Sequence, residues 1–338
     1  MVRGERGPGM TISPDLSTFT TRLHFQGCLV FESALRIGAQ KSQAVDEPDL
    51  PVLRNAAGLP YIPGSSFKGA LRSYVEAVAR ALQARPGMQE HNLACLPVGK
   101  ASERPAQDPI PDICLFQSEV SLLKQVKPQE WHTSGKMPSE LVNRLPSAAV
   151  IQNDVTAHGE GQVVDRTLRD LSCWTCRIFG APWLASKVLI RDLVLVPETF
   201  FRTEIRDGVG IDRDTGRAAS GLKYQFEIVP AGAAFGLELL VENATEAELG
   251  LLWLGVSAFE RGEVLMGGAR SRGLGWCKLT PEWTASRYVT AENLLDILLR
   301  PAEMGVLPDL SQAPPGWLSA FAVAIGAQGG SHAQATVE

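Results

Sequence analysis

Cysteine pairs are the residues whose spacing most directly indicates chemistry. Cys173 and Cys176 form a C-x-x-C knuckle, and upstream Cys95 and Cys114 have 18 residues between them. Four thiolates from two separated pairs fit the tetrahedral coordination of a structural zinc ion. His91, four residues before Cys95, is the alternative fourth ligand. The pattern predicts a Zn²⁺ site, but it also fits coincidental core cysteines, because the first pair is not a tight knuckle.

A second zinc chemistry shares these cysteines. His158 and Glu160 precede Cys173 and Cys176 in a pattern similar to the H-x-E…P-C-x-x-C signature of zinc-dependent deaminases. Ser172 stands where the signature has proline, and the flank HGEGQ is too rich in glycine for the helix that must aim the His and Glu. The deaminase is therefore a remote alternative. A redox role is disfavoured, because no thioredoxin-like βαβ pattern surrounds the knuckle.

An anion-binding pattern occupies residues 61–72, YIPGSSFKGALR. Ser65 and Ser66 at a predicted helix start offer hydroxyl and backbone N–H groups, and Lys68 and Arg72 lie one turn apart on one helix face. A phosphodiester backbone fits this arrangement. A well-capped helix with solvated cations fits the same residues.

Two further segments combine arginine with turn-forming residues. In 267–275, GGARSRGLG, Arg270 and Arg272 stand beside glycines that let another backbone approach closely. This is not the phosphate loop of a nucleotide hydrolase, because Leu274 replaces the required lysine, and a plain structural turn is the alternative. Residues 202–223 hold five basic and four acidic side chains, which indicates an exposed hairpin of mixed charge.

Composition places these motifs in a folded, loop-rich chain. The protein has 338 residues, of which 45% are apolar and 20% charged, with 32 Gly and 22 Pro. These values allow one large domain or two medium ones and exclude a fibrous or mostly disordered chain. No apolar stretch approaches a membrane span and the N-terminus lacks the apolar core of a signal peptide, so we expect a cytoplasmic protein without a membrane partner. The net charge of −5 does not indicate a nucleic-acid partner.

The motifs must be positioned by strands and helices that alternate along the chain. Period-two patterns predict strands, with a strand pair at 224–230 and 235–241, and apolar spacings of three and four predict amphipathic helices. The predicted strands are 19–30, 188–196, 224–230 and 235–241, and the predicted helices are 67–82 and 246–259. This order predicts an α+β domain with helices packed on an antiparallel sheet. Residues 86–165 are polar, irregular and rich in proline, which is typical of a functional insertion.

Four motifs, in this order, resemble those of the backbone subunits of type III CRISPR effector complexes, which belong to the repeat-associated mysterious protein (RAMP) superfamily. They are YIPGSSFKGALR at 61–72, the cysteine knuckle followed by RIFG at 173–180, GIDRDTG at 210–216 and GGARSRGLG at 267–275. The resemblance covers about residues 19–280.

The resemblance implies a fold and a domain organisation. Residues 19–280 would form a ferredoxin-like palm, similar to an RNA-recognition motif, with a zinc-binding insertion at about 86–180 and a thumb hairpin at about 202–223. A flexible leader, 1–18, would precede the palm. An acidic C-terminal extension, 281–338, with six acidic and two basic residues, would follow it.

The resemblance also implies partners. Neighbouring RAMP subunits would stack along a guide CRISPR RNA, and the thumb would kink the duplex of guide and target RNA at regular intervals. Phosphate contacts would come from the helix start, the thumb and the glycine-rich turn. The implied RNA-binding residues are Ser65, Ser66, Lys68, Arg72, Arg206, Arg213, Arg270 and Arg272.

A catalytic aspartate is implied by the same resemblance. The target-cleaving member of the family has Asp-x-Pro-Val before the Pro-Gly-Ser-Ser turn, which is Asp49 here. Asp46 is the runner-up, because the loop after Gly38 lacks the second glycine of many relatives. The aspartate would hold Mg²⁺ or a similar metal for attack of a ribose 2′-hydroxyl on the adjacent phosphate. The implied function is a metal-dependent endoribonuclease subunit, and a non-catalytic guide-RNA-binding scaffold of the same complex is the alternative.

Overall fold

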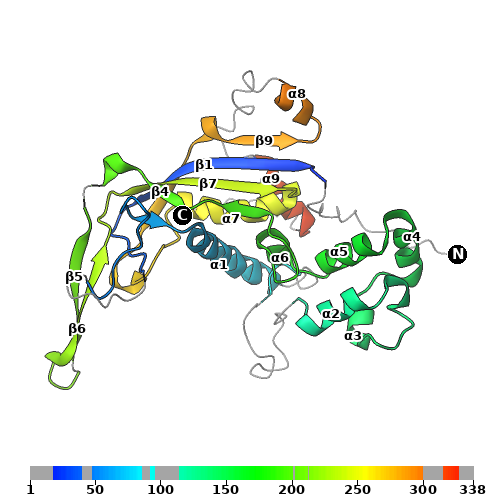
Figure 1. Ribbon diagram of the computed structural model, residues 1–338, viewed down its shortest axis with the longest axis horizontal. Coiled ribbons are helices and arrows are strands. Elements are labelled where there is room, and N and C mark those ends of the chain that lie inside the picture. Colours follow the sequence, from blue (N-terminus) through cyan, green and yellow to red (C-terminus); the bar gives the residue numbers. More distant parts are fainter. Residues whose placement is uncertain are drawn as a thin grey trace, which may run out of the picture.

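The computed structural model describes residues 18–39, 48–85, 92–95, 114–200, 202–211, 213–299 and 315–326. In these ranges the chain forms a seven-stranded antiparallel sheet, a separate two-stranded hairpin and helices. Figure 1 shows that a helical insertion and the hairpin project from opposite ends of the sheet. Among the helices of these ranges, none combines the length and the hydrophobicity that a bilayer span requires.

Strand β1 (Thr21–Phe31) lies in the middle of the sheet, close to the prediction for 19–30. It pairs on one side with β7 (Ala234–Glu242) and on the other with both β8 (Cys277–Pro281) and β9 (Arg287–Thr290). All three pairings are antiparallel. The alternation of buried and partly exposed residues along β1 therefore separates a core face from an open face.

The remaining strands complete a βαββαβ order. Beyond β7 lie β3 (Val188–Ile190) and β4 (Leu193–Leu195), and β2 (Tyr61–Ile62) pairs with β4. Helix α1 (Gly64–Gln83) follows β1 and β2, and helix α7 (Glu246–Glu260) connects β7 to β8. This order holds when the short edge strands β2 and β9 are set aside and β3 and β4 are taken together as one interrupted strand, and it is the order of ferredoxin-like domains. The predicted α+β class is confirmed.

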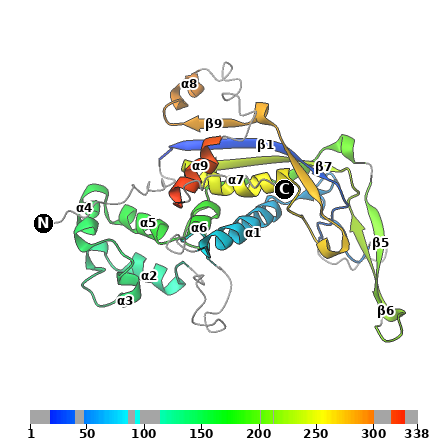
Figure 2. The same cartoon turned by 180° about the vertical axis from the view of Figure 1, so that it is seen from behind.

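Helices α1 and α7 cover the core face of the sheet, which Figure 2 shows from the helical side. Phe25 of β1 lies edge to face against Trp253 of α7, with ring centroids 5.4 Å apart. Phe67 of α1 stacks on Phe259 of α7 at 4.7 Å. These aromatic contacts hold both helices against the same strand layer.

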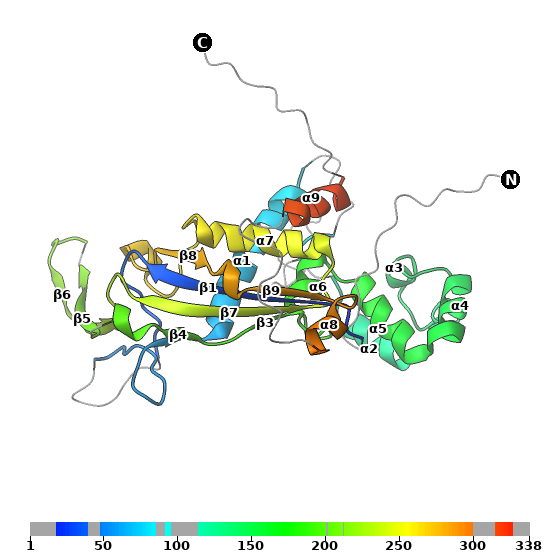
Figure 3. The same ribbon diagram turned by 90° about the horizontal axis from the view of Figure 1, so that it is seen from above.

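The described part of the C-terminal region 281–338 packs against the sheet and helix α7. Strand β9 extends the sheet edge, and α9 (Pro315–Ala324) packs on α7 in the layer that Figure 3 shows above the strands. A Cβ on Gly250 would lie 2.1 Å from the carbonyl oxygen of Trp317, so only glycine allows this approach. Helix α7 is therefore buried on nearly all sides and lacks the polar face of the amphipathic helix that we predicted for 246–259. The short helix α8 (Leu294–Leu299) follows β9.

Two strand predictions were wrong, one in the continuity of a strand and one in its pairing. The predicted strand 188–196 is divided into β3 and β4, and the intervening Asp192 accepts the N–H of Gly64 at the start of α1. The predicted pair 224–230 and 235–241 does not form. Instead β6 (Ala218–Ile228) pairs with β5 (Glu204–Ile211) in the projecting hairpin, while β7 pairs with β1.

The insertion is also more regular than we predicted. Its described part is mainly helical and buries its own hydrophobic cluster, which includes Trp131, Leu141 and Leu168. The apolar residues were overlooked because they are distributed over several short helices, each with few apolar positions. These helices are α2 (Gln117–Gln125), α3 (Ser139–Val142), α4 (Ala148–His158) and α5 (Glu160–Asp170). Helix α6 (Trp174–Phe179) follows them, and its Ile178 and Phe179 belong to the main core.

Candidate functional site

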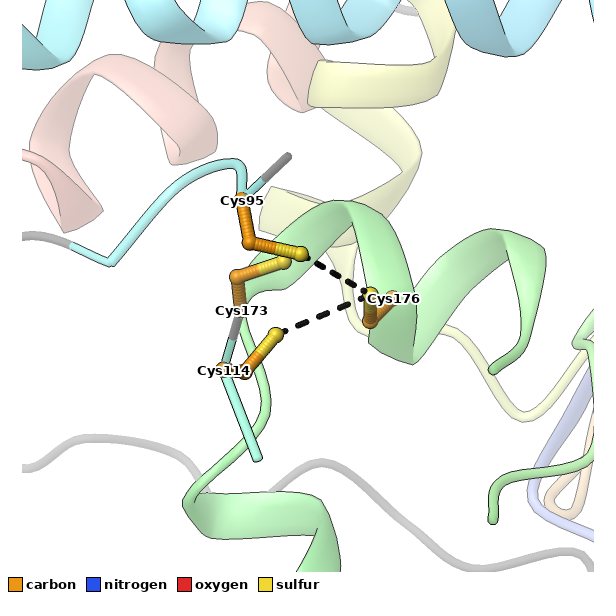
Figure 4. Close-up of side chains that lie close together, drawn as sticks. All are labelled: Cys95, Cys114, Cys173 and Cys176. Atoms are coloured by element: carbon orange, nitrogen blue, oxygen red, sulfur yellow. Dashed lines mark hydrogen bonds between the residues drawn. The ribbon is translucent and has the colours of Figure 1, made fainter. Parts of the chain in front are cut away.

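The four predicted zinc ligands meet in one buried cluster, shown in Figure 4. Their sulfur atoms all lie within 4.8 Å of one another, and Cys176 is 3.6 Å from Cys95 and 3.7 Å from Cys114. Sulfurs around a tetrahedral zinc with Zn–S bonds of about 2.3 Å are roughly 3.8 Å apart. The four cysteines form no disulfide with one another. This donor set fits zinc. His91 lies outside the described residues.

The cysteine cluster joins the insertion to the palm. The backbone N–H groups of Trp174 and Thr175 donate to the carbonyls of Asn92 and Leu93, which bring Cys95 to the start of α6. Arg144 of the insertion donates to the carbonyl of Cys114 at 2.6 Å. The cluster thus fixes segments that are distant in the sequence.

Arg72 of α1 belongs to this cluster. It donates to the carbonyl of Gly180, approaches the sulfur of Cys176 at 3.8 Å and forms an ion pair with Glu76 at 2.7 Å. Burial opposes the charge of Arg72, but the hydrogen bond and ion pair with Glu76, with nearby cysteines, leave its pKa raised. A fixed cation stabilises a thiolate-rich site.

Lys68 is likewise engaged within the chain. Its Nζ donates to the hydroxyl of Ser186 at 2.6 Å and to the carbonyl of Val188 at 2.9 Å. Burial lowers the pKa of Lys68, and the charge of Arg72 lowers it further. The predicted helix face therefore exists, but it faces β3 and α6. A role of these two cations on guide phosphates stays a prediction.

The start of α1 is partly occupied by the chain itself. The helix begins at Gly64, whose N–H donates to the carboxylate of Asp192 at 2.8 Å. This carboxylate takes the position that an external anion would use. Ser65 and Ser66 follow in the first turn and are exposed.

The deaminase alternative is not supported. His158 ends α4 and Glu160 begins α5, and both are exposed on the insertion. Neither belongs to the potential metal-binding group found in the described ranges, which consists of the four cysteines alone. A catalytic zinc keeps an open coordination position, whereas four thiolates close the site.

Asp49 lies against the base of the thumb hairpin β5–β6. Its Oδ2 accepts the backbone N–H of Gln225 at 2.8 Å. Leu50 next to it pairs in parallel with β6, since its N–H donates to the carbonyl of Gln225 and its carbonyl accepts the N–H of Glu227. An isolated parallel bridge thus joins the Asp49 segment to the thumb. Asp46 lies outside the described residues.

Glu227 is the functional candidate that sequence reasoning missed. Its buried carboxylate accepts the N–H of Val52 at 2.9 Å, the guanidinium of Arg54 at 2.5 Å and the hydroxyl of Thr203. Burial alone would raise the pKa of Glu227, but these hydrogen bonds and the charge of Arg54 hold it below the usual range. Nothing in the local sequence distinguishes this acid from its neighbours in the hairpin.

The glycine-rich turn meets the same thumb base. Leu274 packs with Ala34, Phe226 and Ile228 in a small hydrophobic cluster. Arg272 donates to the hydroxyl of Tyr224. The structure therefore brings Asp49, the turn and the thumb base together, while Lys68 and Arg72 lie with the cysteines.

Four of the arginines predicted to bind RNA lie exposed at this end of the molecule. Arg206 lies on β5 and Arg213 follows it toward the hairpin tip, and both are exposed. Arg270 and Arg272 form the exposed 3-10 turn within 267–275. Exposed guanidinium groups are suited to phosphate recognition, because their donors match phosphate oxygens.

Comparison with known proteins gives one family. The model of the RAMP superfamily matches residues 28–278. No curated protein sequence matches. Among solved structures, a chain of "Type III-B Cmr-beta Cryo-EM structure of the Apo state" is 16% identical, with a TM-score of 0.35, and the match covers 77% of this chain and 97% of that one.

We expect the purified protein to carry about one zinc per chain. Cys173→Ser should remove the metal and lower the thermal midpoint, because one ligand of a closed site is lost. Elemental analysis and thermal unfolding check both effects, with Cys28→Ser, a cysteine of β1 outside the cluster, as control. Absence of metal from protein never exposed to chelators would contradict the site. Loss of metal in His91→Ala but not in Cys95→Ser would make His91 the ligand.

Glu227→Gln should lower the free energy of unfolding by about 1.5–3 kcal/mol at pH 7, because charged hydrogen bonds in a buried site are lost. Since the folded-state pKa of Glu227 is lowered, its ionic contribution is complete above the unfolded pKa of about 4.3 and disappears as the pH falls through the lower folded value. The difference from wild type should therefore shrink at acid pH. Denaturant unfolding against pH measures this, with the exposed Glu204→Gln on the same hairpin as control. A difference that does not vary with pH would exclude the ionic role.

Proposed function

The chain belongs to the RAMP superfamily, and from this premise we propose that it is a backbone subunit of a type III CRISPR effector complex. In that role it binds the guide CRISPR RNA beside neighbouring RAMP subunits and cleaves complementary target RNA. The observation that carries the proposal is the attachment of the Asp49 segment to the thumb strand β6, beside an exposed arginine turn. A candidate catalytic carboxylate and candidate phosphate-binding groups share one end of the palm.

The proposed reaction is attack of a ribose 2′-hydroxyl on the adjacent phosphorus. The new 2′-O–P bond replaces the P–O5′ bond, which leaves a 2′,3′-cyclic phosphate and a 5′-hydroxyl. Asp49 fits a magnesium ligand, because its Oδ1 has no partner among the described residues while Oδ2 is held by the backbone of Gln225. A bound divalent cation would supply charge neutralisation at the phosphate.

The chain's own residues position the RNA in this proposal. Arg270 and Arg272 on the turn, with Arg206 and Arg213 on the thumb, contact phosphates. The thumb separates the target strand so that one ribose reaches the in-line geometry that a duplex prevents. Glu227 keeps the Asp49 segment in register with the thumb. The four cysteines hold a structural zinc that orders the insertion.

One observation favours a non-catalytic scaffold as the second candidate. In the described ranges, Asp49 belongs to no group of three or more metal-binding side chains. A single carboxylate is a minimal magnesium site, which leaves most ligands to water and phosphate. The scaffold would bind guide RNA through the same arginines.

Asp49→Ala should lower target cleavage by at least about 100-fold and leave complex assembly and target binding intact, because base pairing to the guide supplies the binding. Assembled complex with labelled target RNA, with and without Mg²⁺, gives the measurement. The control is Asp207→Ala, because Asp207 is an exposed acidic residue on strand β5 of the thumb hairpin. Unchanged cleavage in Asp49→Ala with loss in Asp46→Ala would move the assignment to Asp46. If neither change matters, the subunit is a scaffold.

Arg270→Ala combined with Arg272→Ala should weaken guide binding across unrelated sequences. It should also reduce the slope of log affinity against log salt by about 1.4, since each phosphate contact to a single strand contributes about 0.7. Titrations at several salt concentrations measure the slope. A sequence-selective loss of guide binding in the double arginine variant would contradict contact with the RNA backbone.

For Lys68→Ala and Arg72→Ala we expect a lower thermal midpoint as the larger effect, because both side chains donate hydrogen bonds within the chain.

A further inference from the structure

Trp276 is an aromatic side chain that the cleavage site does not explain. All seven tryptophans lie in the described ranges, and only Trp276 is exposed, at 47%. It directly follows the glycine-rich turn and precedes β8. Removing a large aromatic surface from water is favourable, so a partner that covers it would gain stability.

The backbone that carries Trp276 is held firmly. Its N–H donates to the hydroxyl of Ser33 at 3.0 Å, and its carbonyl accepts the N–H groups of Glu32 and Ser33 at 2.8 and 3.3 Å. Gly275 before it has a φ of +87° and donates to the carbonyl of Ala34. A Cβ on Gly275 would lie 2.0 Å from the carbonyl of Met266, so the segment is also closely packed. The exposed indole is therefore attached to a backbone segment that hydrogen bonds and close packing hold in place.

The surroundings of Trp276 are charged. Lys278 and Glu32 beside it form an exposed ion pair at 3.1 Å, and Arg270 and Arg272 precede it on the turn. Among the described residues of 261–281, Trp276 is the one large exposed apolar side chain. A protein partner that covers an apolar patch would need more apolar neighbours. A ligand with a flat face and a charged backbone fits this setting better.

We infer that Trp276 stacks on an unpaired base of the bound RNA, while the arginines of the preceding turn contact the adjacent phosphates. This rests on the proposed function in RNA binding but does not depend on cleavage by this subunit. Base stacking tolerates any sequence, because every base has a π-face. The site therefore takes single-stranded RNA at one nucleotide without reading its identity.

The test uses the full-length protein and a fluorescein-labelled oligouridine. Trp276→Leu should weaken binding by about 5- to 150-fold, the effect of losing one base–aromatic stack. For Trp276→Leu, the slope of log affinity against log salt concentration should equal that of wild type, because no phosphate contact is lost. Arg272→Ala should reduce this slope. Trp276→Phe should keep most of the affinity. Unlabelled oligouridine should also protect wild-type tryptophan fluorescence from acrylamide quenching.

Phe116→Leu is the matched control, because Phe116 is an equally exposed aromatic on the insertion, at 50%. Wild-type affinity in Trp276→Leu overturns the inference. So does an intact RNA affinity combined with loss of subunit association, which would make Trp276 a protein contact. If wild-type protein binds no RNA, the proposed function fails and this inference fails with it. If RNA binds and Asp49→Ala cleaves normally, only the assignment of Asp49 fails.

Discussion

Hydrogen bonding on both sides of strand β1 is the constraint on which the other elements depend. Nine residue pairs join β1 to β7, and β8 and β9 together occupy the opposite side. Because side chains alternate along a strand, a slip of one residue would turn Leu23, Phe25 and Leu29 out of the core. The register therefore fixes the surface on which α1 and α7 pack. It also fixes the two ends of the sheet from which the insertion and the thumb project.

Polar anchors hold the two projecting parts, where less apolar surface is available. At the insertion end, four buried thiols and Arg72 join α1, α6 and the described segments that carry Cys95 and Cys114. At the thumb end, buried Glu227 joins the Asp49 segment to β6. Buried charged groups are tolerated only when they are hydrogen-bonded, and both anchors meet this condition. A polar anchor with defined geometry also fixes orientation more strictly than apolar contact does.

Charge pairing within the chain determines which surfaces are available to a partner. On the open face of the sheet, His24 of β1 and Arg191 both bind Glu238 of β7, and Arg22 pairs with Glu242. The outward positions of β1 and β7 hold no Phe, Tyr or Trp. These two strands therefore lack the aromatic platforms on which RNA-recognition motifs stack bases. Exposed Arg206, Arg213, Arg270 and Arg272 lie instead at the thumb end, where the glycine-rich turn and the Asp49 segment meet.

Features that depend on the spacing of nearby residues could be predicted from the sequence alone. The period of two in 19–30 predicts β1, the helical spacing of 67–82 predicts the buried face of α1, and the two cysteine pairs predict one cluster. Tertiary structure decided what depends on residues distant in the chain. These features are the pairing of β6 with β5 in the thumb, the hydrogen bonds of Lys68 and Arg72 within the chain, the packing of α9 on α7 and the hydrogen bonds of buried Glu227. Local periodicity predicts which face of an element is apolar, but only the folded structure determines which element or ligand contacts that face.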